Sequence, residues 1–227
     1  MAQLSLLQTG IYTIPDAAEL VEAPQRMVRI WVEGHTGKQA PVIENELGRV
    51  DGKTAVSFHN LMELRFVAVF HGAGVKLREI RAIMDEVRVT LAHPHPFATK
   101  TVFKTDGKKI VAAIGRKNGV ENIYDLRSQN YEMQPVVMKS LKDDVIYDPT
   151  GDAIAWRPRR KIAPNVIVNP YFSFGRPILK TSHIPTNALA NSVKVEGSIK
   201  FVSEMFDIPE SHVREAVSFE NDLRQAA

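Results

Sequence analysis

The spacing of apolar residues changes its period twice along this chain, and these changes constrain the fold more than any other feature. Helical spacing gives way to the two-residue alternation of strands, and helical spacing returns near the end. Pro94 and Pro96 mark the first change, because proline interrupts a helix and restricts the residue before it. We expect an α+β fold with a helical unit over residues 1–96, a β-rich connector over 97–161 and a small helical domain over 162–227.

The composition is typical of a globular protein of the reducing cytoplasm. Of the 227 residues, 44% are hydrophobic and 24% are charged, so the chain has enough apolar surface to bury a core. It has no cysteine, which excludes disulfides, thiolate nucleophiles and iron–sulfur clusters. No apolar run reaches the roughly 18 residues of a membrane helix, and the start lacks the basic region of an export signal. We expect a cytoplasmic protein that makes no membrane contact.

Two short helices separated by a tight turn are predicted near the start. The hydroxyl of Thr13 is a good N-cap for a helix over Thr13–Leu20, and Pro24 interrupts the chain before a second helix over Gln25–Val32. Met27, Val28 and Trp31 lie on one side of that second helix and are expected in the core. The other side carries Gln25, Arg26 and Arg29. Side chains of these types make forked contacts to base edges or phosphates in a major groove.

A small hairpin follows the second helix. Ala40–Ile43 is strand-like, and Val50–Val56 contains an Asp-Gly turn signal. The basic residues here are Lys38, Arg49 and Lys53. They are expected to reach phosphates or the minor groove, although a charged hairpin is also a common solvated feature. Two longer helices are predicted next, over 61–70 and from residue 75 toward 91.

The connector concentrates basic charge. Residues 97–161 carry 13 Lys and Arg against 8 Asp and Glu, whereas the flanking parts are nearly balanced. Residues 101–105 and 109–114 flank an Asp-Gly turn and predict a hairpin, and a second pair is predicted at 123–126 and 136–138. The connector ends on a basic run that contains Arg157, Arg159 and Arg160 and is typical of an exposed linker.

The last part has a short apolar strand and a Gly-Arg-Pro turn, with a helix start at Pro185. Helices are predicted over 198–206 and 211–223. Their polar positions are mostly acidic, which argues against DNA and for contact with a protein.

No catalytic or metal site is expected. His93 and His95 have no carboxylate beside them in the sequence, so we interpret this pair as a polar turn. Ser173, Ser182 and His183 supply residue types of a hydrolase triad, but no nucleophile-elbow glycines surround either serine. We expect a protein that is not an enzyme and needs no cofactor.

Two stretches carry a family resemblance. The segment from Tyr12 to Arg81, including Ser57-Phe-His-Asn-Leu, resembles the winged helix–turn–helix of MerR-type regulators. A second resemblance is to a short antitoxin domain that was long classified as a domain of unknown function. It covers residues 168–186, from Val-Asn-Pro-Tyr-Phe to Ile-Pro-Thr, and residues 213–219. Lys180 and His183 depart from the glycine and arginine common there. Chains that join these two parts resemble VapB-type antitoxins.

The resemblance implies a type II antitoxin, which represses its own operon and neutralises a PIN-like ribonuclease toxin. On that interpretation the guanidinium groups of Arg157, Arg159, Arg160 and Arg176 would dock on the acidic, magnesium-binding centre of the toxin. The apolar faces of the last two helices are the alternative docking surface. We expect a homodimer, because one short recognition helix gives limited affinity whereas two can read half-sites roughly 34 Å apart.

Two other classes of function stay open at this point. The first is a stand-alone MerR-like regulator whose C-terminal part senses a small ligand. The second is a hydrolase or nuclease, which the sequence favours least. An antitoxin should purify with a small ribonuclease, whereas a sensor should purify alone and change its DNA affinity with a metabolite.

Overall fold

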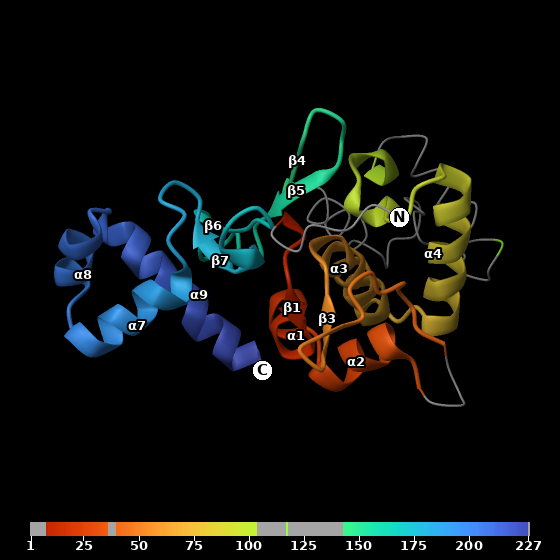
Figure 1. Cartoon of the computed structure of the whole chain (residues 1–227), viewed down its shortest axis with the longest axis horizontal. Helices are drawn as coiled ribbons and strands as arrows, with labels where there is room; N and C mark the ends of the chain where they lie inside the picture. Colours follow the sequence, from red (N-terminus) through yellow and green to blue (C-terminus); the bar gives the residue numbers. More distant parts are fainter. Residues whose placement is uncertain (1–7, 36–39, 104–116, 118–142, 227) are drawn as a thin grey trace, which may run out of the picture.

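The computed structural model of the chain describes residues 8–35, 40–103, 117 and 143–226, and its fold is α+β (Figure 1). Within these residues, seven α-helices accompany two antiparallel sheets. None of the helices in the described ranges has the length and apolar character that crossing a bilayer requires.

The first two helices begin where their capping residues predict. Helix α1 (Ile14–Val21) starts after Thr13, whose side chain accepts from the Asp16 amide while the Asp16 carboxylate accepts from the Thr13 amide. Helix α2 (Gln25–Glu33) starts after Pro24, as expected from the fixed backbone of proline. The predicted pair of short helices is confirmed.

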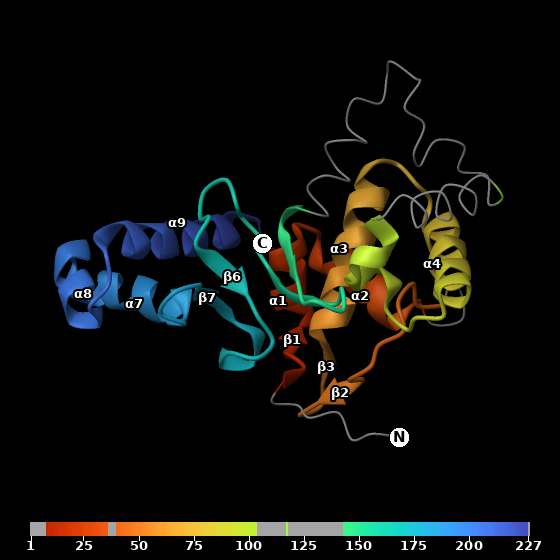
Figure 2. The same cartoon turned by 90° about the horizontal axis from the view of Figure 1, so that it is seen from above.

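The next two helices are longer, and the first of them is central to this part of the molecule (Figure 2). Helix α3 (Phe58–Gly72) begins at Ser57, whose hydroxyl accepts from the Asn60 amide, and its first turns are buried on all sides. Helix α4 (Leu77–Leu91) buries one apolar side, including Ile80 and Met84. Both helices were predicted, and Figure 2 shows α3 lying between α1 and α4.

The first sheet has three short strands in the order β1 (Tyr12–Thr13), β3 (Lys53–Val56) and β2 (Arg49–Val50). Asp51 and Gly52 connect β2 to β3, and both have positive φ, as a tight two-residue hairpin turn requires. The hairpin predicted from the Asp-Gly signal is therefore confirmed.

The strand predicted over Ala40–Ile43 is wrong. The amides of Val42 and Ile43 both donate to the carbonyl of Trp31 near the end of α2, at 2.7 and 3.2 Å. The guanidinium of Arg81 binds the carbonyl of Ala40 at 2.6 Å. These backbone groups are thus used by a helix end and a side chain, and residues 40–43 belong to no strand.

The start of the expected connector is also different. Residues Pro96–Ala98 (η2) and Lys100–Phe103 (η3) form 3-10 turns, so the strand predicted from residue 101 is wrong in its described part. The amides of Ala98 and Thr99 donate to the carbonyls of His95 and Pro96, which are the bonds of a 3-10 turn. The rest of that hairpin and the pair at 123–126 and 136–138 lie outside the described residues.

The second sheet has four antiparallel strands in chain order. They are β4 (Val145–Tyr147), β5 (Ala153–Trp156), β6 (Val166–Val168) and β7 (Pro177–Leu179). Strands β5 and β6 pair through Trp156 and Val168. The sheet therefore continues across the boundary expected at 161/162, and the connector and the C-terminal part share it. A 3-10 turn, η4 (Ser173–Gly175), precedes β7.

Three helices complete the chain: α7 (Thr186–Glu196), α8 (Ile199–Phe206) and α9 (Glu210–Ala226). The helices predicted at 198–206 and 211–223 are confirmed. Figures 1 and 2 show α7, α8 and α9 together at the end of the molecule opposite α4, with the end of α9 returning to α1. One cluster of buried side chains runs from Tyr12 to Leu223, so both ends of the chain contribute to the same core.

Candidate functional site

Helix α2 separates apolar from polar side chains across its axis. Val28, Trp31 and Val32 are buried, and they hold the helix on the core. The opposite side exposes the three residues predicted to contact DNA, Gln25, Arg26 and Arg29. Among the described residues none of these side chains makes a hydrogen bond or an ion pair. Their amide and guanidinium donors therefore stay available for an external ligand.

The β2–β3 hairpin lies against the end of this helix. The hydroxyl of Thr54 in β3 donates to the carboxylate of Glu33, the last residue of α2. Arg49 and Lys53 project from the two strands and are exposed, as expected for phosphate contacts. Lys38, the third basic residue predicted here, lies outside the described residues. The β2–β3 hairpin is thus held at the end of α2, and the two elements expose Arg26, Arg29, Arg49 and Lys53.

The predicted toxin-contacting arginines have very different environments. Arg176 is exposed and makes no side-chain hydrogen bond or ion pair within the described part of the chain. Arg160 is exposed, and its guanidinium lies 3.6 Å from the carboxylate of Asp144. Arg157 is half-buried, and its amide donates to the Asp144 carbonyl. The basic run is therefore not the uniformly exposed linker that its composition predicts.

Arg159 is buried, and its guanidinium is fully used inside the chain. Its Nε lies 2.5 Å from the carboxylate of Asp222 in α9, and Nη1 lies 2.9 Å from that of Glu22. Nη1 and Nη2 also donate to the carbonyls of Leu20 and Glu19, at 3.1 and 2.9 Å. Arg159 thus satisfies carbonyls at the end of α1 and joins that helix to α9. This position is incompatible with the expected docking of Arg159 on a toxin.

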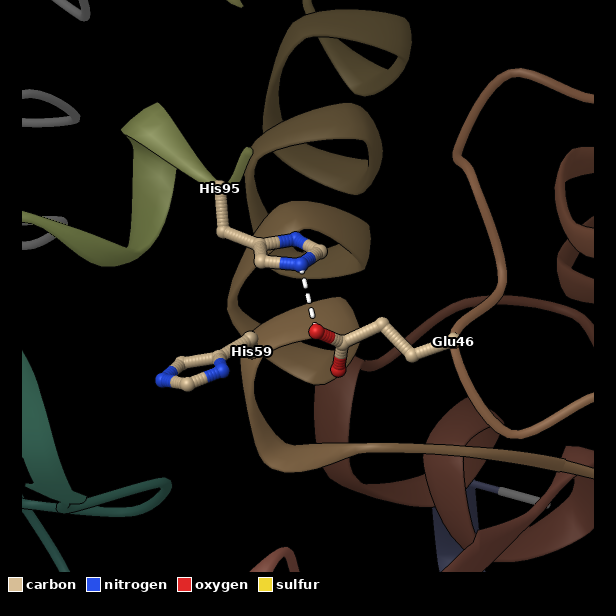
Figure 3. A group of neighbouring side chains, drawn as sticks. All are labelled: Glu46, His59 and His95. Carbon is tan, nitrogen blue, oxygen red and sulfur yellow. Dashed lines mark ion pairs between the residues drawn. The ribbon is translucent and has the colours of Figure 1, made fainter. Parts of the chain in front are cut away.

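A second group of polar side chains lies around the start of α3. His95 is buried between two carboxylates: its Nε2 lies 2.6 Å from Glu46 Oε1, and its Nδ1 lies 3.2 Å from Glu63 Oε2. The ring of His59 stacks on that of His95, with centroids 5.3 Å apart (Figure 3). Glu46, His59 and His95 each bring one ligand atom into a group whose members all lie within 4.8 Å of one another.

These side chains are held by neighbours that fix their orientation. The Asn60 amide group donates to Glu63 Oε2 at 3.2 Å, and its carbonyl oxygen accepts from the Glu46 amide at 3.1 Å. Arg88 of α4 places Nη2 3.6 Å from Glu63 Oε1. The fully buried Glu63 therefore faces a cation on each side, from His95 and from Arg88. The cluster connects α3, α4 and the loop that precedes the β2–β3 hairpin.

The electrostatics of the cluster separate its two histidines. Burial disfavours the charged form of His95, but hydrogen bonds to Glu46 and Glu63 outweigh it and raise the pKa of His95 to about 9. Burial also opposes ionisation of Glu46, yet its hydrogen bond to His95 and the charge of that ring lower its pKa to about 2. Burial and the neighbouring His95 lower the pKa of His59. His59 is therefore the neutral ring of the pair at neutral pH.

Comparison with known proteins identifies the fold and no family. No family model and no curated protein matches the chain. Among solved structures, the X-ray structure of Rv2018 from Mycobacterium tuberculosis is similar, with a TM-score of 0.74 and 19% sequence identity. The match covers 91% of this chain and 96% of that chain. The two chains share one fold along nearly their whole length.

Sequence patterns reveal little of the histidine–carboxylate cluster. No carboxylate stands near His95 in the sequence, which argued against a metal site there, but the structure places Glu46 and Glu63 beside its ring. A local signal was present, since His59 and Glu63 are separated by four residues and a helix places such residues on neighbouring turns. Glu46 gives no local signal, because it reaches the cluster from a loop.

Proposed function

We propose that this chain is a DNA-binding repressor of the antitoxin type. The observation that carries the proposal is the outward side of α2, where Gln25, Arg26 and Arg29 are exposed and unpaired within the described residues. Side chains left without internal partners keep their donors available for an external ligand, and guanidinium and amide forks match guanine, adenine and phosphate.

The order of elements supports a winged helix–turn–helix assignment. In this proposal α1 and α2 are the two helices of the motif, with α2 entering the major groove, and the β2–β3 hairpin is the wing. Arg49 and Lys53 would then contact phosphates beside the groove. We propose a homodimer on DNA, because two copies of α2 would read two half-sites and raise the affinity of a short helix.

The proposed protein partner is a PIN-like ribonuclease toxin. The exposed Arg176 follows a turn on which Tyr171, Phe172 and Phe174 are also exposed. Arginine and aromatic side chains are enriched at protein interfaces and supply most binding hot spots. A guanidinium here could pair with the carboxylates that hold magnesium in the toxin. Arg157 and Arg160 are the other proposed contacts, and Arg159 is left out because its guanidinium is used internally.

Reversing one charge on α2 tests DNA binding. Arg29→Glu is expected to weaken binding to the DNA upstream of the chain's own gene by at least about tenfold, because one forked base or phosphate contact is replaced by repulsion. Lys194→Glu makes the same change in net charge on the exposed side of α7 and should leave affinity unchanged. Band shifts at fixed salt measure both. Equal affinity in the two variants, with unchanged circular dichroism, would remove α2 from the proposal.

Co-expression tests the toxin partner. A small ribonuclease encoded beside this chain should purify with it and lose its toxicity when both are produced. Arg176→Glu should reduce that protection, whereas Lys194→Glu should retain it. A chain that purifies alone and gives no protection would contradict the antitoxin assignment and leave the DNA-binding proposal standing.

A further inference from the structure

We propose that Glu46, His59 and His95 form a binding site for one divalent cation of the zinc type. The proposal is independent of the proposed function, because the group includes none of the residues on the exposed side of α2. It joins the start of α3, the loop before β2 and the turn before η2.

The residue types favour this class of cation. Two imidazoles and one carboxylate provide the nitrogen and oxygen donors that zinc and its first-row neighbours prefer, and three protein ligands leave a fourth position for water. Magnesium and calcium are disfavoured, since both prefer sites built mainly from oxygen atoms. All three ligand atoms already lie within 4.8 Å of one another. Figure 3 shows them on three separate segments, with the Glu46 carboxylate directed toward the rings.

Bringing these atoms to an ion requires movements of up to about 1.5 Å, because ligand atoms that now lie as much as 4.8 Å apart would approach one another. Metal–ligand distances of about 2.0–2.1 Å in a tetrahedral site separate ligand atoms by about 3.3 Å. The present separation of Glu46 Oε1 and His95 Nε2 is 2.6 Å, so this pair would open by about 0.7 Å. The new bond forms at His95 Nε2, and the proton on that nitrogen passes to solvent.

The carboxylates in the cluster have acceptor capacity that the protein leaves unfilled. Glu46 Oε2 and Glu63 Oε1 are both buried and have no hydrogen-bond partner within the described structure. Buried polar atoms are normally paired. Arg88 Nη2 lies 3.6 Å from Glu63 Oε1 and accounts for that oxygen, so Glu46 Oε2 is the one that needs an explanation. A cation coordinated by the Glu46 carboxylate would explain it.

The second layer of side chains matches what a histidine ligand requires. Glu63 Oε2 lies 3.2 Å from Nδ1 of His95, on the far side of the ring from Glu46. A carboxylate at this position fixes the tautomer and the orientation of a metal-bound imidazole. Asn60 donates to the same Glu63 oxygen and so holds it in place.

Zinc binding to the full-length, chelator-treated protein tests the proposal. Competition with a chromophoric zinc chelator should give one ion per chain for the wild type. His59→Ala and Glu46→Gln should each weaken binding at least tenfold, and Glu63→Gln about tenfold or more through loss of orientation. His183→Ala removes an exposed histidine outside the cluster and should leave binding unchanged.

Two measurements keep the test decisive if a variant folds poorly. Circular dichroism reports whether each variant retains its helices, and X-ray absorption of the zinc-loaded wild type should give a first shell of nitrogen and oxygen at about 2.0–2.1 Å. Absence of stoichiometric binding by the folded wild type would overturn the proposal. Binding that survives His59→Ala but is lost in His93→Ala would overturn the assignment of the ligands.

Discussion

Neighbouring arginines in this chain have opposite roles because their surroundings differ. The side chain of Arg159 is 6% exposed and bonds to two carboxylates and two backbone carbonyls. The side chain of Arg160, the next residue, is 54% exposed and has one ion-pair partner at 3.6 Å. Both belong to the same basic run in the sequence. Their difference arises from the return of α9 to α1, which no local pattern encodes.

Replacing these two arginines in turn measures that difference. Arg159→Ala is expected to lower the free energy of unfolding by about 2 to 3 kcal/mol, because charge-assisted hydrogen bonds are lost and two α1 carbonyls lose their donor. Arg160→Ala should change it by less than about 0.5 kcal/mol, as expected for an exposed ion pair. Urea titration followed by circular dichroism measures both values. Equal effects would mean that Arg159 does not join α1 to α9.

At the residue scale, the sequence predicted which side chains α2 would expose, and it failed where partners are distant. Arg26 and Arg29 are exposed because helical period alone separates them from Val28 and Trp31. Glu46 and His95 are 49 positions apart in the sequence, and a loop and a turn bring them together. Only helix packing determines such a meeting, so spacing could not reveal it.

The turn before β7 shows how one element depends on another far away in the chain. Gly175 has φ +86°, and a Cβ at this position would overlap the hydroxyl of Tyr12. The Ile11 amide donates to the Phe174 carbonyl in the same turn at 3.0 Å. The 3-10 turn η4 thus packs against the first strand of the chain, and a glycine is required for the approach.

Two glycine variants distinguish the free-energy cost of overlap with Tyr12 from the cost of backbone strain. Gly197 also has positive φ, at the end of α7, but a Cβ added there would meet no atom within 4 Å. Gly197→Ala should therefore cost about 1 kcal/mol from backbone strain alone. Gly175→Ala should cost about 3 kcal/mol or more, because steric overlap with Tyr12 adds to the strain. Thermal melts of both variants measure the difference. Similar losses would show that the turn moves away from Tyr12 without cost.

Elements with local signals were predictable, and elements with distant partners were not. Thr13, Pro24 and Ser57 mark three helix starts because caps and proline act within one turn. The Asp51–Gly52 turn acts over the same range. Residues 40–43 resemble a strand, but the amides of Val42 and Ile43 donate to the end of α2, a pairing that only tertiary structure decides.

At the scale of the whole molecule, the core does not divide where the sequence pattern changes. The pairing of Trp156 with Val168 joins the connector to the C-terminal part in one sheet. One cluster of buried side chains includes both Tyr12 and Leu223, and a second, small cluster of Ala155, Ile167 and Ile178 lies in the second sheet. Periodicity reports the type of each element and carries no information about which elements pair, so it predicted three units where packing is continuous.

Continuous packing predicts that the two ends of the molecule unfold together. The chain has two tryptophans, and both are buried: Trp31 in α2 and Trp156 in β5. Trp156→Phe leaves Trp31 as the fluorescent reporter of the N-terminal helices, and Trp31→Phe leaves Trp156 as the reporter of the second sheet. In each variant the urea transition followed by fluorescence should coincide with that followed by far-ultraviolet circular dichroism, as a single cooperative unit requires.

Separate midpoints in either variant would contradict this expectation and would support independent units. Arg159→Ala, introduced into each of the two tryptophan variants, tests whether the Arg159 contacts cause the cooperative unfolding. If the Arg159 contacts to Glu22 and Asp222 contribute to cooperativity, their loss should separate the urea midpoints measured by fluorescence and by circular dichroism. The reason is that α1 and α9 then lose the ion pairs between them. Arg160→Ala should leave the transitions coincident, since that side chain joins no helices.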